Sequence, residues 1–122
     1  MKKLLFILSL GILFNCSNEQ KDYVPDLKTT EGIEKYADRA SIIAKDFVKQ
    51  NLKSPSTAKF PSSDFSYSNP EVDSRTITIK SYVDAENSFG ATLRKDYYVK
   101  LRFKSGDWAD MQNWELLQIN VD

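Results

Sequence analysis

The chain has 122 residues, with 17 basic and 17 acidic side chains, no histidine and one cysteine. The lack of histidine excludes Ser-His-Asp and Cys-His catalysis and the usual imidazole zinc sites, and the single cysteine excludes an intramolecular disulfide. The balanced charge provides no basic excess for nucleic acid, and we expect a monomer that holds no cofactor and no metal.

The N-terminal segment has the pattern of an export signal. Lys2 and Lys3 precede an uncharged, mostly apolar run at residues 4–14. This run is much shorter than the roughly 20 residues that a membrane-spanning helix needs. A basic start followed by a short apolar run is typical of secretory signal peptides. The sequence therefore predicts residues 1–15 as a cleaved signal peptide rather than a retained membrane anchor.

The end of this run, Leu13-Phe14-Asn15-Cys16, resembles the lipobox of bacterial lipoproteins, in which an aliphatic residue and two variable positions precede a cysteine. Asn15 departs from that family, which usually has Gly, Ala or Ser before the cysteine. The resemblance implies cleavage before Cys16 and lipidation of its thiol. A plain signal peptide with an incidental cysteine is the alternative.

A lipid on Cys16 would anchor the chain to a membrane of the cell envelope, which is the outer membrane if the cell is Gram-negative. Several acyl chains, at about 0.8 kcal/mol per buried CH₂, can hold a soluble domain durably. Residues 16–28 are polar and carry Pro25, which predicts a flexible tether. A single domain is expected to follow at residues 29–122.

The domain is predicted to begin with an amphipathic helix. Thr29 or Thr30 can cap its start, and it should end near Lys53 because Pro55 disfavours helical backbone in the preceding residue. Steps of three and four place the apolar residues on one face. These residues are Ile33, Tyr36, Ala37, Ala40, Ile43, Ala44, Phe47, Val48 and Leu52.

Beyond a loop at residues 54–61, from which Phe60 should enter the core, apolar residues recur at every second position, as in strands. Four strands are expected: a short one around Phe65 and Tyr67, then 76–83, 93–103 and 114–121. The residues expected to point inward are Ile77, Ile79, Val83, Leu93, Tyr97, Val99, Leu101, Phe103, Leu117, Ile119 and Val121.

These elements predict an α+β fold, with one N-terminal amphipathic helix packed on a four-stranded antiparallel sheet. We prefer a cystatin-like arrangement, in which the sheet curls around the helix. This is an analogy of fold and implies no activity.

Ser56-Thr57-Ala58-Lys59 matches the Ser-x-x-Lys nucleophile motif of penicillin-binding proteins and class A β-lactamases. The partner motifs Ser-Asp-Asn and Lys-Thr-Gly are missing from the sequence, and Phe60-Pro61 would end a helix at once. We therefore interpret the motif as a capped, solvated turn and expect no enzymatic activity. Acidic residues in turns are likewise interpreted as solvated: Asp84, Glu86, Asp107 and Asp110.

Aromatic and arginine side chains on the solvent side of the strands indicate a binding surface, because Tyr, Trp and Arg dominate the energetics of protein interfaces. The alternative is that these aromatic residues only stabilise the sheet. Phe89, in a polar turn, either tucks into the core or is displayed. The candidate surface consists of Tyr82, Asn87, Phe89, Arg94, Tyr98, Arg102 and Trp108.

Leu52–Pro61 and Val83–Ala91, followed by Arg94, resemble a family of small exported or phage-associated bacterial proteins of uncharacterised function. The resemblance implies a shared small α+β domain and carries over no catalytic residues. We expect a membrane-anchored lipoprotein whose domain is a non-enzymatic binding module for a protein or another envelope component. The alternatives are a phage superinfection-exclusion factor, a small hydrolase and an enzyme inhibitor.

Overall fold

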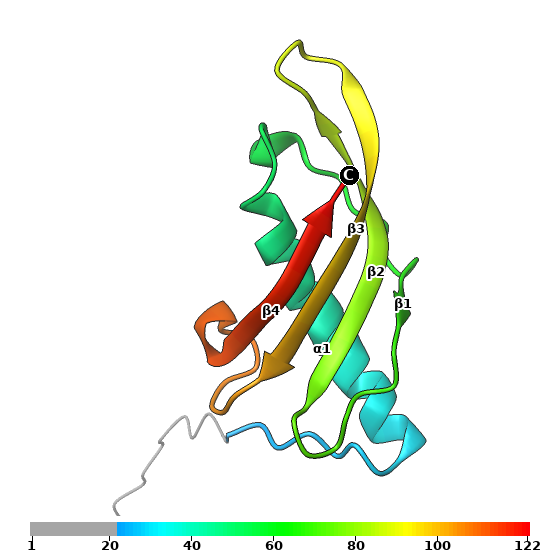
Figure 1. Cartoon of the computed structure of the whole chain (residues 1–122), viewed down its shortest axis with the longest axis vertical. Coiled ribbons are helices and arrows are strands. Elements are labelled where there is room, and N and C mark those ends of the chain that lie inside the picture. Colours follow the sequence, from blue (N-terminus) through cyan, green and yellow to red (C-terminus); the bar gives the residue numbers. More distant parts are fainter. Residues whose placement is uncertain (1–21) are drawn as a thin grey trace, which may run out of the picture.

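A computed structural model describes residues 22–122, so the predicted signal peptide and Cys16 lie outside the described residues. One helix packs on one face of a four-stranded antiparallel sheet of order β1-β2-β3-β4 (Figure 1). The predicted α+β fold is confirmed, and the cystatin-like topology stays a prediction. The elements are α1 (Thr30–Lys49), η1 (Pro55–Thr57), β1 (Ser66–Tyr67), β2 (Thr76–Glu86), β3 (Thr92–Phe103), η2 (Met111–Asn113) and β4 (Trp114–Val121).

Helix α1 begins and ends with local hydrogen bonds. The side chain of Thr29 accepts a hydrogen bond of 3.1 Å from the N–H of Gly32, which makes Thr29 the N-cap. A Cβ at position 32 would lie 2.0 Å from the carbonyl oxygen of Asp26. Only glycine therefore fits at this position, where the backbone of Asp26 passes close to the first turn of the helix. The α-helix ends at Lys49, earlier than the predicted Lys53, and a turn then returns Leu52 to the core.

The core lies between α1 and the sheet. The buried face of α1 contributes Tyr36, Ile43 and Val48, each at most 1% exposed. The facing strand residues alternate with less buried ones, which confirms the period of two predicted for β2 and most of β3. The fully buried strand side chains are Ile77, Ile79, Val83, Val99, Leu101 and Phe103.

Strand β4 contains a β-bulge that reverses the predicted orientation of one side chain. Leu101 pairs with Leu116, whereas the adjacent Lys100 pairs with Gln118, so Leu117 is the extra residue. Leu116 packs against the core and Leu117 is 42% exposed. The prediction that Leu117 points inward was wrong, because the extra residue of a bulge shifts the alternation of side chains between the two parts of the strand that it separates.

The hairpin formed by β2 and β3 extends further than predicted. Strand β2 continues to Glu86, and its distal end projects beyond the rest of the molecule (Figure 1). Leu93 pairs with Ala85 in this region and is 47% exposed. Leu93 therefore lies on the predicted inner face, opposite the buried Ala85, but it is not buried itself, because alternation defines a face of the sheet and not how far other elements cover that face.

The segment before the helix is packed, so the predicted tether is wrong for residues 23–27. The Tyr23 ring lies 5.4 Å from the ring of Phe103, and the Arg39 guanidinium lies 4.0 Å from the Tyr23 ring centre. The Tyr23 N–H donates to the carbonyl of Gly106 at 2.9 Å, and Leu27 is 6% exposed. The five residues Tyr23 to Leu27 are too few to show the period of a helix or strand, from which such packing could be predicted.

Candidate functional site

The face of the sheet that points away from α1 brings together side chains from β2 and β3. The register places Lys80 opposite Tyr98 and Tyr82 opposite Asp96. Both tyrosines are half-buried, and the Lys80 ammonium lies 5.8 Å from the ring centre of Tyr98. The two tyrosines predicted for this surface therefore lie on neighbouring strands of the same face.

The arginines predicted for this surface are engaged in ion pairs. Arg94 donates two hydrogen bonds to the Asp84 carboxylate, at 2.8 and 3.0 Å, and its guanidinium lies 4.0 Å from the ring centre of Tyr82. The Arg94 hydrogen bonds and charge lower the pKa of the Asp84 carboxyl. Further along the sheet, Arg102 of β3 donates to Glu115 of β4.

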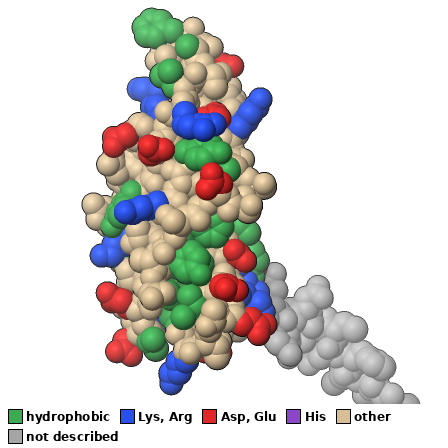
Figure 2. Space-filling model, turned by 90° about the vertical axis from the view of Figure 1, so that its right-hand side faces the viewer, with side chains coloured by type: hydrophobic (Ala, Val, Ile, Leu, Met, Phe, Trp, Pro, Cys, Tyr) green, Lys and Arg blue, Asp and Glu red, His purple; other side chains and the backbone are tan. Residues whose placement is uncertain are grey.

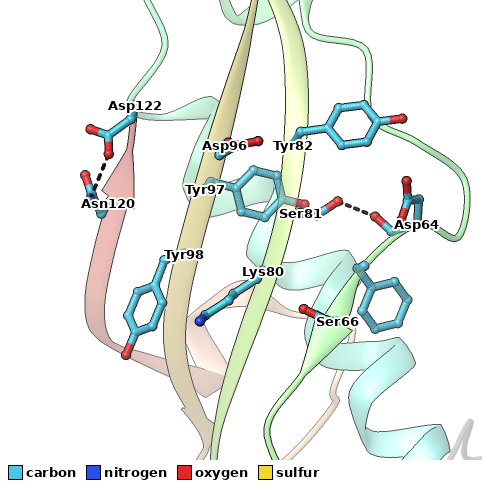
Figure 3. Close-up of a pocket in the computed structure, with 11 residues that line it drawn as sticks. Asp64, Ser66, Lys80, Ser81, Tyr82, Asp96, Tyr97, Tyr98, Asn120 and Asp122 are labelled. Atoms are coloured by element: carbon cyan, nitrogen blue, oxygen red, sulfur yellow. Dashed lines mark hydrogen bonds between the residues drawn. The ribbon is translucent and has the colours of Figure 1, made fainter.

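Between these two ion pairs the outer face is hollowed. The hollow has a volume of about 580 Å³, and Figure 3 shows Tyr82 and Tyr98 at opposite ends with Lys80 and Asp96 between them. Asn120 from β4 lines one side. The full lining is Asp64, Phe65, Ser66, Lys80, Ser81, Tyr82, Asp96, Tyr97, Tyr98, Asn120 and Asp122.

Most of the lining residues that the predicted surface lacked are polar. The alternation that placed Tyr82 and Tyr98 outward also placed Lys80 and Asp96 there, and this signal was present in the sequence. Asn120 lies between Ile119 and Val121, which were predicted to point inward, so the same alternation also places Asn120 outward.

The turn between β2 and β3 displays Phe89, which is 95% exposed. The Asn87 side chain accepts hydrogen bonds from the N–H groups of Phe89 and Ala91, at 2.9 and 3.0 Å, and Gly90 takes a φ of 78°. Asn87 therefore shapes the turn that presents the phenyl ring. Figure 2 shows hydrophobic side chains at this projecting end of the molecule.

The structure separates Trp108 from the rest of the predicted surface. Trp108 lies in the loop after β3, at the end of the sheet opposite to Phe89, and it is partly buried against the core. Its ring centre lies 4.9 Å from the Arg39 guanidinium, and its carbonyl accepts a hydrogen bond of 2.7 Å from the Trp114 indole. Through these contacts Trp108 packs against the rest of the domain, at the end opposite to the hairpin tip.

The Ser-x-x-Lys segment docks on the edge of β2. The backbone of Lys59 exchanges two hydrogen bonds with Asp84, at 2.8 and 3.0 Å, and the Thr57 hydroxyl accepts one from the N–H of Glu86 at 2.9 Å. Ser56 is exposed in the 3₁₀ turn, and within residues 22–122 its side chain forms no hydrogen bond to Lys59. The segment thus supports the base of the projecting hairpin.

Within the described part of the chain, no three acidic or cysteine side chains are grouped closely enough to hold a metal ion. None of the helical segments at residues 22–122 has the length and apolar character needed to cross a bilayer. Comparisons with protein-family models, curated proteins and solved structures found no match to the chain.

Proposed function

We propose that the protein is a lipid-anchored, non-enzymatic binding module of the cell envelope, cleaved before Cys16, that recognises a partner protein through the tip of the β2–β3 hairpin. The observation that carries the proposal is the almost complete exposure of Phe89 on an ordered turn. The lipid anchor is supported by the lipobox resemblance at Leu13–Cys16.

The Phe89 side chain contributes little to the stability of the isolated domain, because it is almost fully exposed. Burial of a phenylalanine side chain is worth about 1.5–3 kcal/mol, and Phe89 gains almost none of this in the fold. Tyr82 lies against Arg94 and Tyr98 near Lys80, so these two rings also stabilise the sheet. The hydrogen bonds of Asn87 hold the Phe89 backbone in place, which lowers the entropy lost when a partner buries the ring.

The direction of the hairpin relative to the anchor supports a partner in the aqueous space. The described chain begins at one end of the long axis, and the hairpin tip lies at the other (Figure 1). Residues 16–21 span at most about 20 Å when fully extended, so a lipid on Cys16 keeps the base of the domain near the membrane. The tip is then presented roughly one strand length further out, away from the bilayer.

The anchor has a direct test. Cys16→Ala should abolish lipid labelling and release the protein from the membrane fraction, since residue 16 is the only cysteine. Metabolic labelling with a fatty-acid analogue and membrane fractionation measure the two effects. Unchanged partitioning of the alanine variant would refute lipidation.

The tip has a separate test in living cells. A photo-crosslinking amino acid at position 89 should give a covalent adduct of one defined mass. The same amino acid at position 117, which is also an exposed apolar position but lies on β4, is the matched control and should not give that adduct.

Phe89→Ser then distinguishes binding from folding. We expect partner co-purification to fall by about tenfold or more, because the interface loses an aromatic anchor. The free energy of unfolding should change by no more than about 0.5 kcal/mol, because the ring contacts solvent. Full co-purification with the serine variant would contradict the role of the tip.

A further inference from the structure

We infer that the hollow on the outer face of the sheet is a binding site for a pyranose unit of an oligosaccharide, with Tyr98 as its stacking platform and Lys80, Asp96 and Asn120 as its hydrogen-bonding groups. This site is separate from the hairpin tip and does not depend on the partner proposed for Phe89.

The hollow has the size and composition of a small-ligand site. Its volume of about 580 Å³ falls in the range of roughly 300–1,000 Å³ that such sites occupy. Tyrosine rings at its two ends supply apolar faces, and the floor between them is polar (Figure 3). All four strands contribute to it, because β2 and β3 carry the rings, β4 supplies Asn120 and β1 supplies Ser66.

The two charged groups in the middle of the hollow differ from those on either side of it, which form ion pairs. The Asn120 amide already donates one hydrogen bond of 3.3 Å to the Asp122 carboxylate (Figure 3). Asp84 is paired with Arg94, and Arg102 with Glu115. Within residues 22–122, no hydrogen bond or ion pair engages the Lys80 ammonium or the Asp96 carboxylate. On the outer face, the charged side chains on either side of the hollow thus form ion pairs, whereas Lys80 and Asp96 within it do not.

The mixture of groups selects the class of ligand. An ammonium donates hydrogen bonds, a carboxylate accepts them and the Asn120 amide does both. The lining carries one ammonium, that of Lys80, and three carboxylates, those of Asp64, Asp96 and Asp122, so an anionic ligand would be repelled. A neutral ring with hydroxyl groups on its edge and C–H groups on its faces uses all of them, since its C–H face can stack on Tyr98.

Saturation-transfer difference NMR on the full protein, purified in a detergent without sugar groups, tests the site. The probes are the linear tetrasaccharides of N-acetylglucosamine, of β-1,4-linked glucose and of α-1,4-linked glucose. We expect transfer to at least one of them, with the strongest signals on ring C–H protons. No transfer to any of the three would overturn the inference.

Variants locate the binding in the hollow. Tyr98→Ala should weaken binding of the probe about tenfold through the loss of stacking, and Asp96→Asn should also weaken it. Tyr98→Phe keeps the ring and should retain binding, which separates loss of stacking from misfolding. Glu86→Gln removes an exposed carboxylate from β2 outside the hollow and is the matched control. Equal binding by wild type and Tyr98→Ala would place any sugar contact elsewhere.

Discussion

Replacement of Trp114 by alanine is expected to lower the free energy of unfolding by about 3–5 kcal/mol. Trp114 is 3% exposed, and its ring lies 5.5 Å from that of Tyr36 and 5.1 Å from that of Phe103. Its indole N–H donates to the carbonyl of Trp108, so the substitution removes a large buried ring and frees an acceptor. Since domains of this size are stable by only about 5–15 kcal/mol, the variant should be close to unfolding.

Urea denaturation followed by circular dichroism measures this loss. Leu117→Ala is the matched control, because it truncates an apolar residue of the same strand at its exposed bulge. Its expected effect is no more than about 0.5 kcal/mol. Similar losses in the two variants would contradict the packing of β4 described above.

Tyr36→Phe should cost about 1–3 kcal/mol although it removes only one oxygen atom. The Tyr36 hydroxyl donates to the carbonyl of Arg75 and accepts from the N–H of Phe103 at 3.1 Å. Phe103 is 1% exposed, so its N–H would lose its partner with little access to water. The hydroxyl therefore joins the helix to the ends of β2 and β3.

The same tyrosine should make the protein sensitive to alkali. Burial raises the pKa of Tyr36 from 10.0 to about 12, and burial also raises the pKa of Tyr23 and Tyr97. Between these pH values the folded protein retains a proton that the unfolded chain has lost, so unfolding becomes more favourable as the pH rises. The stabilisation is complete below pH 10 and is lost as the pH rises towards 12.

Urea midpoints measured from pH 8 to about pH 11 test the linkage. Wild type should lose stability above pH 10, and Tyr36→Phe should lose less, so the difference between the two proteins should narrow. A constant difference across this range would show that the Tyr36 hydroxyl does not titrate as its burial requires.

Local pattern accounts for the parts of the fold that sequence reasoning predicted correctly. Tyr36 and Ile43 were assigned to the buried face of α1 from steps of three and four, and Ile77 and Ile79 to the core from steps of two. The outward positions of Tyr82 and Tyr98 follow from the same alternation. These residues needed no knowledge of distant partners, since the backbone geometry of a helix or strand sets the direction of each side chain.

The errors share a different origin. Leu117 points outward at a bulge, Leu93 is left half exposed near the end of the hairpin, and Tyr23 folds back onto the loop after β3. Each outcome depends on segments far apart in the sequence. The separation of Trp108 from Phe89 has a simpler cause, because the two residues flank the strand predicted at 93–103 and therefore lie at its opposite ends.

The sequence by itself determined the class of fold, most of the core and the outward face of the central strands, because side-chain periodicity is a local property of the backbone. It also motivates the proposal of a lipid anchor at Cys16. Only the tertiary structure decided that Phe89 is displayed and that Lys80 and Asp96 meet in a hollow between two tyrosines. The physical reason is that exposure and proximity depend on which surfaces other elements cover, and that is fixed when the helix, the hairpin and β4 pack together.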